Sequence, residues 1–434
     1  MKFSYFIGDF MKKCIRIFLS VLAFAMFVLS DIFAAGTISA SDLPDGFAGE
    51  GFKKISEASA VTVSTKKDLL SALKKGSVIY VDGMIDMSDG MLPGEGGGSS
   101  PALDEFVKKN SKFSSYIEYR DAYIAVCSTS TEDSLKSSAK SSLYETMYSL
   151  NTAYKRVISV PVSSDTMIIG LGGESGFSGG TISISGVSNV ILRNLLIKDA
   201  YDPFPHHEAN DGYNAQHDGI SVVDSKNVWI DHCTVMDTKD CISVKTGGKI
   251  SEKWQTYDGL CDITKRSDNV TVSYCKFMNH SKTMLIGSSD SEKIDAKERH
   301  VTLHHNYFYN CASRLPMVRL TTIHVYNNYY DGDSKGLYKN SYALGVRYNS
   351  LIHAENNYYG PGISNSFAGS SKKHGTIYSS GEVDKSKNKK KIGEFKAAKE
   401  ALFAIPYKYE AVTAEEVPEY VKSNSGAGVW SVVK

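Results

Sequence analysis

A nine-residue pattern of hydrophobic and polar positions recurs six times from residue 189 onward. The second and fourth positions of each copy are aliphatic, as in NVILRNLLI from Asn189 and NVWIDHCTV from Asn227. Hydrophobic side chains two residues apart are typical of a β-strand with one buried face. The six copies begin at Asn189, Asn227, Asn269, His300, Thr322 and Leu351.

The spacing of these copies indicates how the strands are arranged. Successive copies start 38, 42, 31, 22 and 29 residues apart, which fits a minimal coil of 22 residues with loops of differing length added. A coil of that size holds three short strands and three turns, which is the repeat of a parallel β-helix. A β-sandwich would also supply short strands, but it gives no reason for like residues to recur at like positions. We therefore predict an all-β parallel β-helix, with its longer loops on one face.

The last positions of the unit predict ladders of stacked side chains. The sixth position is polar or carries a ring in every copy, and the seventh becomes asparagine in the last three copies. In a β-helix, residues at equivalent positions of successive coils lie directly above one another, so these side chains should stack. The predicted ladders contain Asn194, His232, Tyr274, His305, Asn327 and Asn356 at the sixth position, and Asn306, Asn328 and Asn357 at the seventh.

Helical segments are expected to cap both ends of the coil. Residues 61–87 combine a short amphipathic helix with a strand, which suits the first end, and a helix near Glu394 to Phe403 is expected to cover the other. A further helix around Ser142 to Lys155 has no predicted position. No change in composition marks a second domain, so residues 36–434 should form one β-helix domain.

Composition and charge limit the classes of protein to which the chain can belong. It has 434 residues, of which 42% are hydrophobic and 22% charged, so a disordered protein is excluded. A basic stretch precedes an apolar run from Ile17 to Leu29, and small residues follow at Ala34 and Ala35; residues 1–35 are thus a predicted signal peptide. We therefore expect a secreted protein. The formal charge of +1 is too small to attract nucleic acid. The sequence contains no second apolar run, so we predict no membrane segment.

The cysteines predict no function. Six remain after the predicted signal peptide, far fewer per residue than in a disulfide-stabilised scaffold. Their spacing matches neither a zinc ribbon nor a CxxC redox site, so we expect buried thiols. They are Cys127, Cys233, Cys241, Cys261, Cys275 and Cys311.

Three aspartates stand beside consecutive copies of the repeat. Asp218 lies nine residues before the second copy, and Asp258 and Asp262 lie in the long insertion before the third. Neighbouring coils would bring these carboxylates together, where they repel one another unless a cation neutralises them. Oxygen ligands without thiolate or imidazole favour Ca²⁺ over zinc. The alternative is that all three are ordinary surface residues in loops.

Three cationic side chains follow on the next coils. Lys282 belongs to NHSKTMLIGSSDS, and Arg314 and Arg319 belong to SRLPMVRL, which falls in the shortest coil and should be held rigidly. Fixed cations beside carboxylates that hold a metal ion make a site for an acidic polymer. Ion pairs between coils would explain the same residues without such a site, and the spacing alone leaves both explanations open.

Some other residues resemble catalytic groups, but a structural role is expected for them. Asp231 and His232 form an apparent dyad, yet adjacent strand residues point to opposite faces, so His232 should join the sixth-position ladder and Asp231 should face the other way. His304, His305 and His324 lie within the repeated strands, where stacking is the simpler explanation.

Several motifs together resemble one family. They are VWIDH at 228–232, DGLCDI at 258–263, SDNVTVSY at 267–274, HSKTMLIGSSDS at 280–291, HHN at 304–306, and the arginine motif at 314–319 that leads into HVYNNYY. Over roughly residues 60–430 the chain resembles the extracellular pectate lyases of the right-handed parallel β-helix type.

The resemblance implies a role for each charged residue. Asp218, Asp258 and Asp262 match positions that bind Ca²⁺, Lys282 and Arg319 match positions that hold substrate carboxylates, and Arg314 matches the Brønsted base. The implied reaction is β-elimination on polygalacturonate, which yields 4,5-unsaturated oligogalacturonides. Since arginine loses its proton in water only near a pKa of about 12, an alkaline activity optimum is expected. A monomer is also expected.

The sequence departs from the family pattern at two positions, and three other functions are possible for a protein of this type. Gln216 replaces an aspartate found in some relatives, which predicts weaker Ca²⁺ binding without substrate, and Thr321 replaces a usual glycine. A pectin lyase, acting on the methyl-esterified polymer, would not need the aspartates. A polygalacturonase would use paired carboxylates for hydrolysis, and a polysaccharide-binding solenoid would not need Arg314.

Overall fold

The computed structural model describes residues 36–94, 98–127, 141–208, 212–239, 242–246, 249–333, 338–370, 372–388 and 392–434. The predicted signal peptide and Cys241 lie outside these ranges. Among the described residues, no helix is both long enough and apolar enough to cross a membrane.

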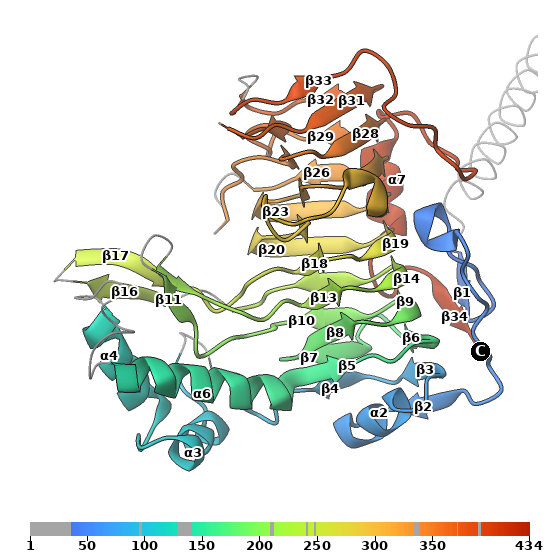
Figure 1. The fold of residues 1–434 in the computed structure, drawn as a ribbon. Coiled ribbons are helices and arrows are strands. Elements are labelled where there is room, and N and C mark those ends of the chain that lie inside the picture. Colours follow the sequence, from blue (N-terminus) through green and yellow to red (C-terminus); the bar gives the residue numbers. More distant parts are fainter. Residues whose placement is uncertain are drawn as a thin grey trace, which may run out of the picture.

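Three long parallel sheets wind around a common core, as the stacked arrows of Figure 1 show. The first contains β2 (Val61–Val63), β3 (Val78–Val81), β6 (Thr166–Gly170), β9 (Ser188–Arg193), β14 (Lys226–Asp231), β19 (Asp268–Ser273), β22 (His300–His304), β25 (Thr322–Tyr326), β28 (Leu351–Glu355), β31 (Thr376–Ser380) and β33 (Lys396–Ala397). The second contains β4 (Met84–Asp86), β7 (Gly176–Ser178), β10 (Leu196–Lys198), β15 (Thr234–Met236), β20 (Lys276–Lys282), β23 (Tyr307–Ser313), β26 (Tyr329–Asp331), β29 (Tyr358–Tyr359) and β32 (Val383–Asp384). The third contains β5 (Ser159–Pro161), β8 (Thr181–Ser185), β13 (Ile220–Val223), β18 (Cys261–Thr264), β21 (Leu285–Ile286), β24 (Met317–Val318), β27 (Leu344–Val346) and β30 (Phe367–Ala368). The predicted parallel β-helix is confirmed.

The six repeats occupy successive rungs of the first sheet, and each continues into the second sheet. Val190, Val228 and Val270 pair in register, and the series continues through the equivalent aliphatic residues of β22, β25 and β28. These side chains are fully buried in the interior. The two-residue periodicity therefore identified the core correctly, because every rung places the same two positions inside.

The sixth-position residues form the turn between the first two sheets. All six have positive φ values between 49° and 54°, a conformation that asparagine adopts more readily than most residues. The rings of His232 and Tyr274 stack at 4.9 Å, and those of Tyr274 and His305 at 4.7 Å. At the seventh position, Nδ2 of Asn306 donates to Oδ1 of Asn328 at 2.9 Å. Both predicted ladders are present.

The turn conformation also explains why one expectation is wrong. Asp231 and His232 do not face apart: Nδ1 of His232 lies 2.7 Å from Oδ2 of Asp231. The alternation of a strand ends at His232, whose φ of 49° turns its ring back toward its neighbour. Both residues are buried, and Asp231 also binds Arg193 and Ser273, so their role is structural as expected.

Helices cover the side and one end of the coil. The first is α2 (Lys66–Leu73), which buries Leu69 and Leu73 against the core as predicted for the N-terminal cap. The helix predicted around Ser142 to Lys155 is α6 (Ser141–Ile158). It packs with α3 (Pro101–Asn110) and α4 (Tyr116–Cys127) into a side module, visible at the lower left of Figure 1.

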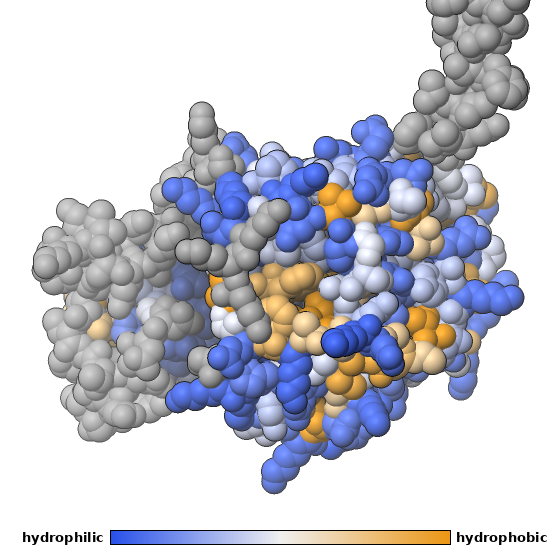
Figure 2. Space-filling view, turned by 90° about the horizontal axis from the view of Figure 1, so that it is seen from above, coloured by the Kyte–Doolittle hydropathy of each residue, from blue (hydrophilic) through white to orange (hydrophobic). Residues whose placement is uncertain are grey.

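The helix predicted near Glu394 to Phe403 is absent from the described residues of that segment. Lys396 and Ala397 instead form β33, the last strand of the first sheet, because the exposed edge of β31 offers backbone partners. Figure 2 looks onto this end and shows hydrophobic side chains at its centre, framed by hydrophilic ones. The C-terminal helix is α7 (Val417–Asn424), which packs beside β26 rather than over the end.

A small mixed sheet extends the side module toward the middle of the coil. It contains β11 (His206–Glu208), β12 (Gly212–Asn214), β17 (Lys249–Trp254) and β16 (Ile242–Thr246). Tyr213 and Trp254 are buried among the tyrosines of α4, which fixes the sheet to the helices. The remaining elements are the short parallel pair β1 (Thr37–Ser39) and β34 (Ser431–Val433), with 3₁₀ turns at Gly46–Gly49 and Ala296–Glu298.

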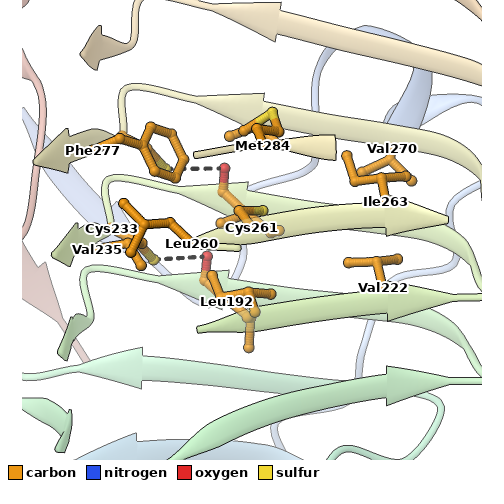
Figure 3. Close-up of a cluster of buried hydrophobic side chains, with 14 of the residues drawn as sticks. Leu192, Val222, Cys233, Val235, Leu260, Cys261, Ile263, Val270, Phe277 and Met284 are labelled. Atoms are coloured by element: carbon orange, nitrogen blue, oxygen red, sulfur yellow. Dashed lines mark hydrogen bonds between the residues drawn. The ribbon is translucent and has the colours of Figure 1, made fainter. Parts of the chain in front are cut away.

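The described cysteines are buried free thiols, as expected. Cys127 lies in the core of the side module, and the other four lie in the interior stack of the coil, where the thiol of Cys233 donates to the carbonyl of Leu192 at 3.6 Å (Figure 3). Cys261 and Met284 lie in the same cluster. Cys261 precedes Asp262 in β18, so the two side chains point to opposite faces of the sheet.

Candidate active site

Asp218 and Asp262 meet at the start of the third sheet. Asp218 lies two residues before β13 and Asp262 is the second residue of β18, and these two strands pair in parallel with Ser221 opposite Asp262. Gly259 lies between the carboxylates: a Cβ on this residue would lie 2.3 Å from Oδ1 of Asp262 and 3.0 Å from Oδ1 of Asp218. The absence of a side chain at Gly259 therefore allows the two carboxylates to approach one another.

Both carboxyl groups hold their protons unusually strongly. Burial and the nearby charge of Asp258 raise the pKa of Asp218 to about 7, against opposition from the N–H of Gly259 at 3.0 Å. Burial, followed by the charges of Asp218 and Asp258, raises the pKa of Asp262 well above its usual range. The amide of Leu285 at 2.9 Å and the charge of Arg314 act in the opposite direction. Two acids whose charges oppose one another in this way favour a cation between them.

Asp258 is close to this pair but turns toward a cation of the chain. Its Oδ1 lies 2.8 Å from Nζ of Lys282. The contact follows from the fold, because Gly259 and Lys282 form a parallel bridge. The same ammonium donates to Oδ1 of Asn214, at the end of β12, at 2.5 Å. The side module thus reaches the site through Asn214.

Arg314 follows β23 and stands one rung beyond Lys282. Ser313 pairs with Lys282 in register, and Arg314 has a φ of 60°, which turns the chain out of the second sheet. Its carbonyl accepts from the amide of Met284 at 2.8 Å, so the backbone is fixed. Within the described residues, no hydrogen bond or ion pair engages its guanidinium, although its charge affects Asp262. Arg314 is therefore the available cation of the site.

Arg319 follows β24, and its side chain pairs with an acid instead of joining the aspartates. Its Nε donates to Oδ1 of Asp290 at 2.9 Å. The structure thus brings together Asp218, Asp258, Asp262, Lys282 and Arg314, while Arg319 lies on the next rungs of the same face. Two of the predicted cations make ion pairs between coils, so that alternative explanation is correct for part of the cluster.

The carboxylate donors suit a hard cation, although they do not converge on a single metal position. In the part of the chain that the structure describes, no three His, Cys, Asp or Glu side chains stand ready to hold a metal ion. Asp258 is the reason, because its carboxylate is directed to Lys282. The raised pKa values of Asp218 and Asp262 show repulsion that Ca²⁺ would relieve, and all the donors are oxygen. The residues present therefore fit the expected ion once Asp258 turns.

Comparison with known proteins settles the family. The sequence model described as "Pectate lyase" matches residues 88–430. The chain belongs to the pectate lyase family of polysaccharide lyases. It is 34% identical to a pectate lyase of Bacillus subtilis over 330 residues, which covers 72% of this chain and 74% of that protein. It is 44% identical to pectate lyase E of Dickeya chrysanthemi over 205 residues, 46% of this chain and only 52% of that protein.

Solved structures of pectate lyases share the fold. A substituted form of the Bacillus subtilis enzyme superimposes with a TM-score of 0.73 at 28% identity, over 91% of this chain and 99% of the other. A pectate lyase bound to a hexasaccharide gives a TM-score of 0.71 at 28% identity, over 89% and 97%. The right-handed β-helix of the pectate lyase family is thus the architecture of this chain.

The two departures from the pectate lyase pattern have different surroundings. Gln216 is exposed, and its backbone N–H donates to Oδ2 of Asp202 at 2.9 Å. Thr321 is buried and its hydroxyl donates to the carbonyl of Arg319 at 2.7 Å. The left-handed conformation falls on Leu320, with a φ of 48°, so Thr321 itself does not need the freedom of glycine.

Three supporting residues were not found from the sequence. Asn214 binds Lys282, and Asp290 binds Arg319. Beneath the aspartates, His280 is buried between Oδ2 of Asp237 at 2.5 Å and the carbonyl of Asp258, to which its Nε2 donates at 2.6 Å. Asp237 and His280 lie ten and eleven residues after the repeat starts at Asn227 and Asn269, just beyond the nine-residue unit, and the repeat pattern assigns them no role. The segments of Asn214 and Asp290 carry no repeat.

Proposed function

We propose that the chain is a secreted, Ca²⁺-dependent pectate lyase that cleaves de-esterified homogalacturonan by β-elimination to 4,5-unsaturated oligogalacturonides. The observation that carries the proposal is the gathering of three carboxylates beside Lys282 and an arginine whose guanidinium is unengaged. Family membership and the shared fold with a pectate lyase bound to a hexasaccharide support a polysaccharide substrate. The signal-like residues 1–35 support secretion.

Each side chain has a defined task in this reaction. Asp218, Asp262 and Asp258 would hold Ca²⁺, which supplies positive charge that offsets the uronate carboxylate and makes the C5 proton more acidic. Lys282 binds a substrate carboxylate once Asp258 leaves it, and Arg319 binds a second one. Arg314, in its neutral guanidine form, accepts the C5 proton; the C4–O4 bond then breaks as the C4–C5 double bond forms, and the departing O4 takes a proton from water.

The site favours this reaction over the rival functions. Hydrolysis by a polygalacturonase needs one carboxylic acid to protonate the leaving oxygen and another to activate water. Here Lys282 and Arg314 stand beside the carboxylates, which suits binding of anionic sugars and not the activation of water. A pectin lyase would have little use for three carboxylates beside a neutral ester.

The test is incubation with polygalacturonate, with and without a calcium chelator, while ultraviolet absorption of the unsaturated product is followed. Absorption that rises and is abolished by the chelator supports the proposal. Reducing ends without absorption would indicate hydrolysis, and activity on the methyl-esterified polymer despite the chelator would indicate a pectin lyase. Arg314→Ala should lower kcat by about 10³-fold or more while polymer binding persists. Unchanged turnover would exclude Arg314 as the base.

A further inference from the structure

Arg319, which binds a substrate carboxylate in the proposed function, is paired with an acidic side chain in the free protein. Its Nε donates to Oδ1 of Asp290 at 2.9 Å. About a fifth of the arginine side chain and a third of the aspartate side chain are exposed, so the pair is open to solvent. A uronate carboxylate that approaches Arg319 therefore meets a guanidinium that is already paired, and a second negative charge beside it.

Hydrogen bonds hold the loop that carries Asp290 in place beside Arg319. Glu292 holds the start of the loop, because its two carboxylate oxygens accept from the amide of Ser288 at 3.0 Å and from the Ser288 hydroxyl at 2.8 Å. On the other side, Nζ of Lys373 donates to the carbonyl of Asp290 at 3.2 Å. The position of Asp290 is thus fixed from both sides.

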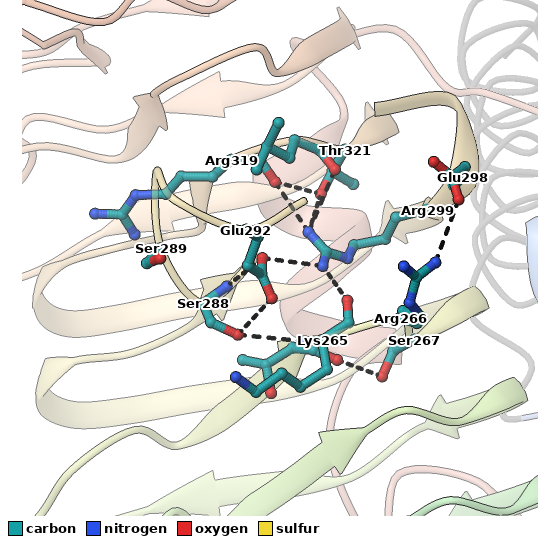
Figure 4. A network of polar contacts seen from close by, with 12 residues as sticks. Lys265, Arg266, Ser267, Ser288, Ser289, Glu292, Glu298, Arg299, Arg319 and Thr321 are labelled. Carbon is teal, nitrogen blue, oxygen red and sulfur yellow. Dashed lines mark hydrogen bonds and ion pairs between the residues drawn. The ribbon is translucent and has the colours of Figure 1, made fainter. Parts of the chain in front are cut away.

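One buried arginine ties this loop to the backbone of Arg319. Arg299 has no exposed surface, and its guanidinium binds Glu292 at 3.2 Å. The same guanidinium donates to the carbonyls of Arg319 at 3.2 Å and Leu320 at 3.3 Å. Figure 4 shows Arg299 between these groups, with the side chain of Arg319 extending away from the network. The two partners of the exposed pair are therefore held at a set separation by a buried network.

We propose that Asp290 is an internal competitor for the substrate carboxylate, which occupies Arg319 in the free enzyme and is displaced when polygalacturonate binds. This inference rests on the proposed function, in which Arg319 binds a substrate carboxylate. Asp290 acts through Arg319 and makes no bond to the reacting atoms. Displacement costs part of the binding free energy of the polymer, and return of Asp290 to Arg319 favours departure of the product.

The experiment compares Asp290→Asn with the parent enzyme on polygalacturonate under saturating Ca²⁺. The amide cannot neutralise Arg319 and does not repel the substrate, so KM should fall by about two- to five-fold, the range for a partly exposed ion pair. The value of kcat should not rise. The difference in KM should shrink at high ionic strength, because salt screens the competing charge. A KM that stays unchanged or rises in Asp290→Asn overturns the proposal, since a merely orienting role for Asp290 predicts a rise.

Two further variants separate this proposal from the proposed function. Glu298→Gln removes an exposed acid paired with Arg266, and it should leave KM unchanged because its charge lies outside the pair with Arg319. Arg319→Ala should raise KM, and Asp290→Asn should have no effect in that background. If Arg319→Ala leaves KM unchanged, the role proposed for Arg319 is wrong. If Arg319→Ala raises KM but Asp290→Asn does not lower it, only the competition by Asp290 is wrong.

Discussion

Asn214 accepts a hydrogen bond of 2.5 Å from the ammonium of Lys282, which links the side module to the charged cluster. The amide of Asn214 is oriented in turn, because its Nδ2 donates to Oε1 of Glu208 at 3.2 Å. Lys282 is thus held between a neutral oxygen and the carboxylate of Asp258. Since Asn214 belongs to β12, the helical module and its small sheet have a part in placing a substrate-binding cation.

Asn214→Ala should weaken substrate binding more than turnover. The change leaves Lys282 with Asp258 alone, so the ammonium is drawn further into the ion pair and is less available to a uronate. A hydrogen bond to a charged group contributes about 1.5–3 kcal/mol, and the loss is smaller here because water can partly replace the missing acceptor. We expect KM to rise about three- to ten-fold with a smaller change in kcat, measured from initial rates.

The matched control for Asn214 is Asn214→Gln, which keeps the acceptor and should recover part of the loss. A melting curve for each variant separates folding from binding. Equal effects of the alanine substitution on KM and kcat would contradict a role confined to Lys282.

Asp262→Asn should stabilise the calcium-free protein while removing its response to calcium. The pKa of Asp262 is raised by burial and by the charges of Asp218 and Asp258, so its ionised form destabilises the free protein at neutral pH. Asparagine keeps the acceptor for the amide of Leu285 without the charge. In chelator, the free energy of unfolding should rise by about 1–3 kcal/mol.

Thermal melting with and without Ca²⁺ tests this second prediction. The parent protein should melt at a higher temperature when Ca²⁺ is added, because a ligand that binds only the folded state stabilises it. Asp262→Asn should lose most of that increase, whereas Asp121→Asn, an exposed acid on α4, should retain it. A full response to calcium in Asp262→Asn would contradict the proposed ligand set.

The coil could be predicted from its repeats, whereas the positions of the loops could not. The aliphatic pairs at Val190, Val228 and Val270 imply a parallel register because each rung presents the same residues to the same interior. The same logic placed Asp218 and Asp262 on neighbouring coils. It failed at His232, where a positive φ ends the alternation.

Contacts between distant segments could not be obtained from the sequence. The pairing of Asn214 with Lys282 depends on how the side module docks, and no repeat records that. The partner of Arg319 was missed for a related reason, because Asp290 lies in a loop positioned by the buried Arg299. The C-terminal end was mispredicted because Lys396 and Ala397 meet an open strand edge, which overrides the helical tendency of their segment.

Asn328 should be among the least tolerant residues of the coil. Its Oδ1 accepts from the backbone amide and the side chain of Asn306, and its Nδ2 donates to Oδ1 of Asn357 at 3.0 Å and to two carbonyls. The side chain is fully buried, so Asn328→Ala leaves several polar groups without partners. We expect a loss of about 2–4 kcal/mol in the free energy of unfolding.

Urea denaturation measures the cost of Asn328→Ala. Asn110→Ala is the control, because that asparagine is exposed at the end of α3 and its side chain bonds, among the described residues, only to the carbonyl of Phe106. It should change stability by less than about 0.5 kcal/mol. Similar losses in both variants would mean that the ladder adds nothing beyond ordinary side-chain contacts.

Glu382 ends the asparagine ladder and should make the coil sensitive to pH. Its Oε1 accepts from Nδ2 of Asn357 at 3.1 Å, while Oε2 is buried and has no hydrogen-bond partner among the described residues. Burial raises the pKa of Glu382 from 4.5 to about 8, against the opposing effect of Asn357. The folded state therefore retains a proton that the unfolded chain releases above pH 4.5, so this contribution to stability is complete below pH 4.5 and is lost as the pH rises through 8.

Glu382→Gln should remove that dependence, because glutamine keeps the acceptor for Asn357 and never ionises. The free energy of unfolding, measured by urea denaturation from pH 5 to pH 9, should fall less steeply in the variant, with slopes that differ by at most about 1.4 kcal/mol per pH unit. The two proteins should be similar near pH 5, and the variant should be the more stable one at pH 8 to 9. Glu400→Gln, at an exposed position, should follow the parent throughout. Parallel curves for Glu382→Gln and the parent would show that the carboxyl group of Glu382 is already ionised in the folded protein and that the ladder ends on a charge.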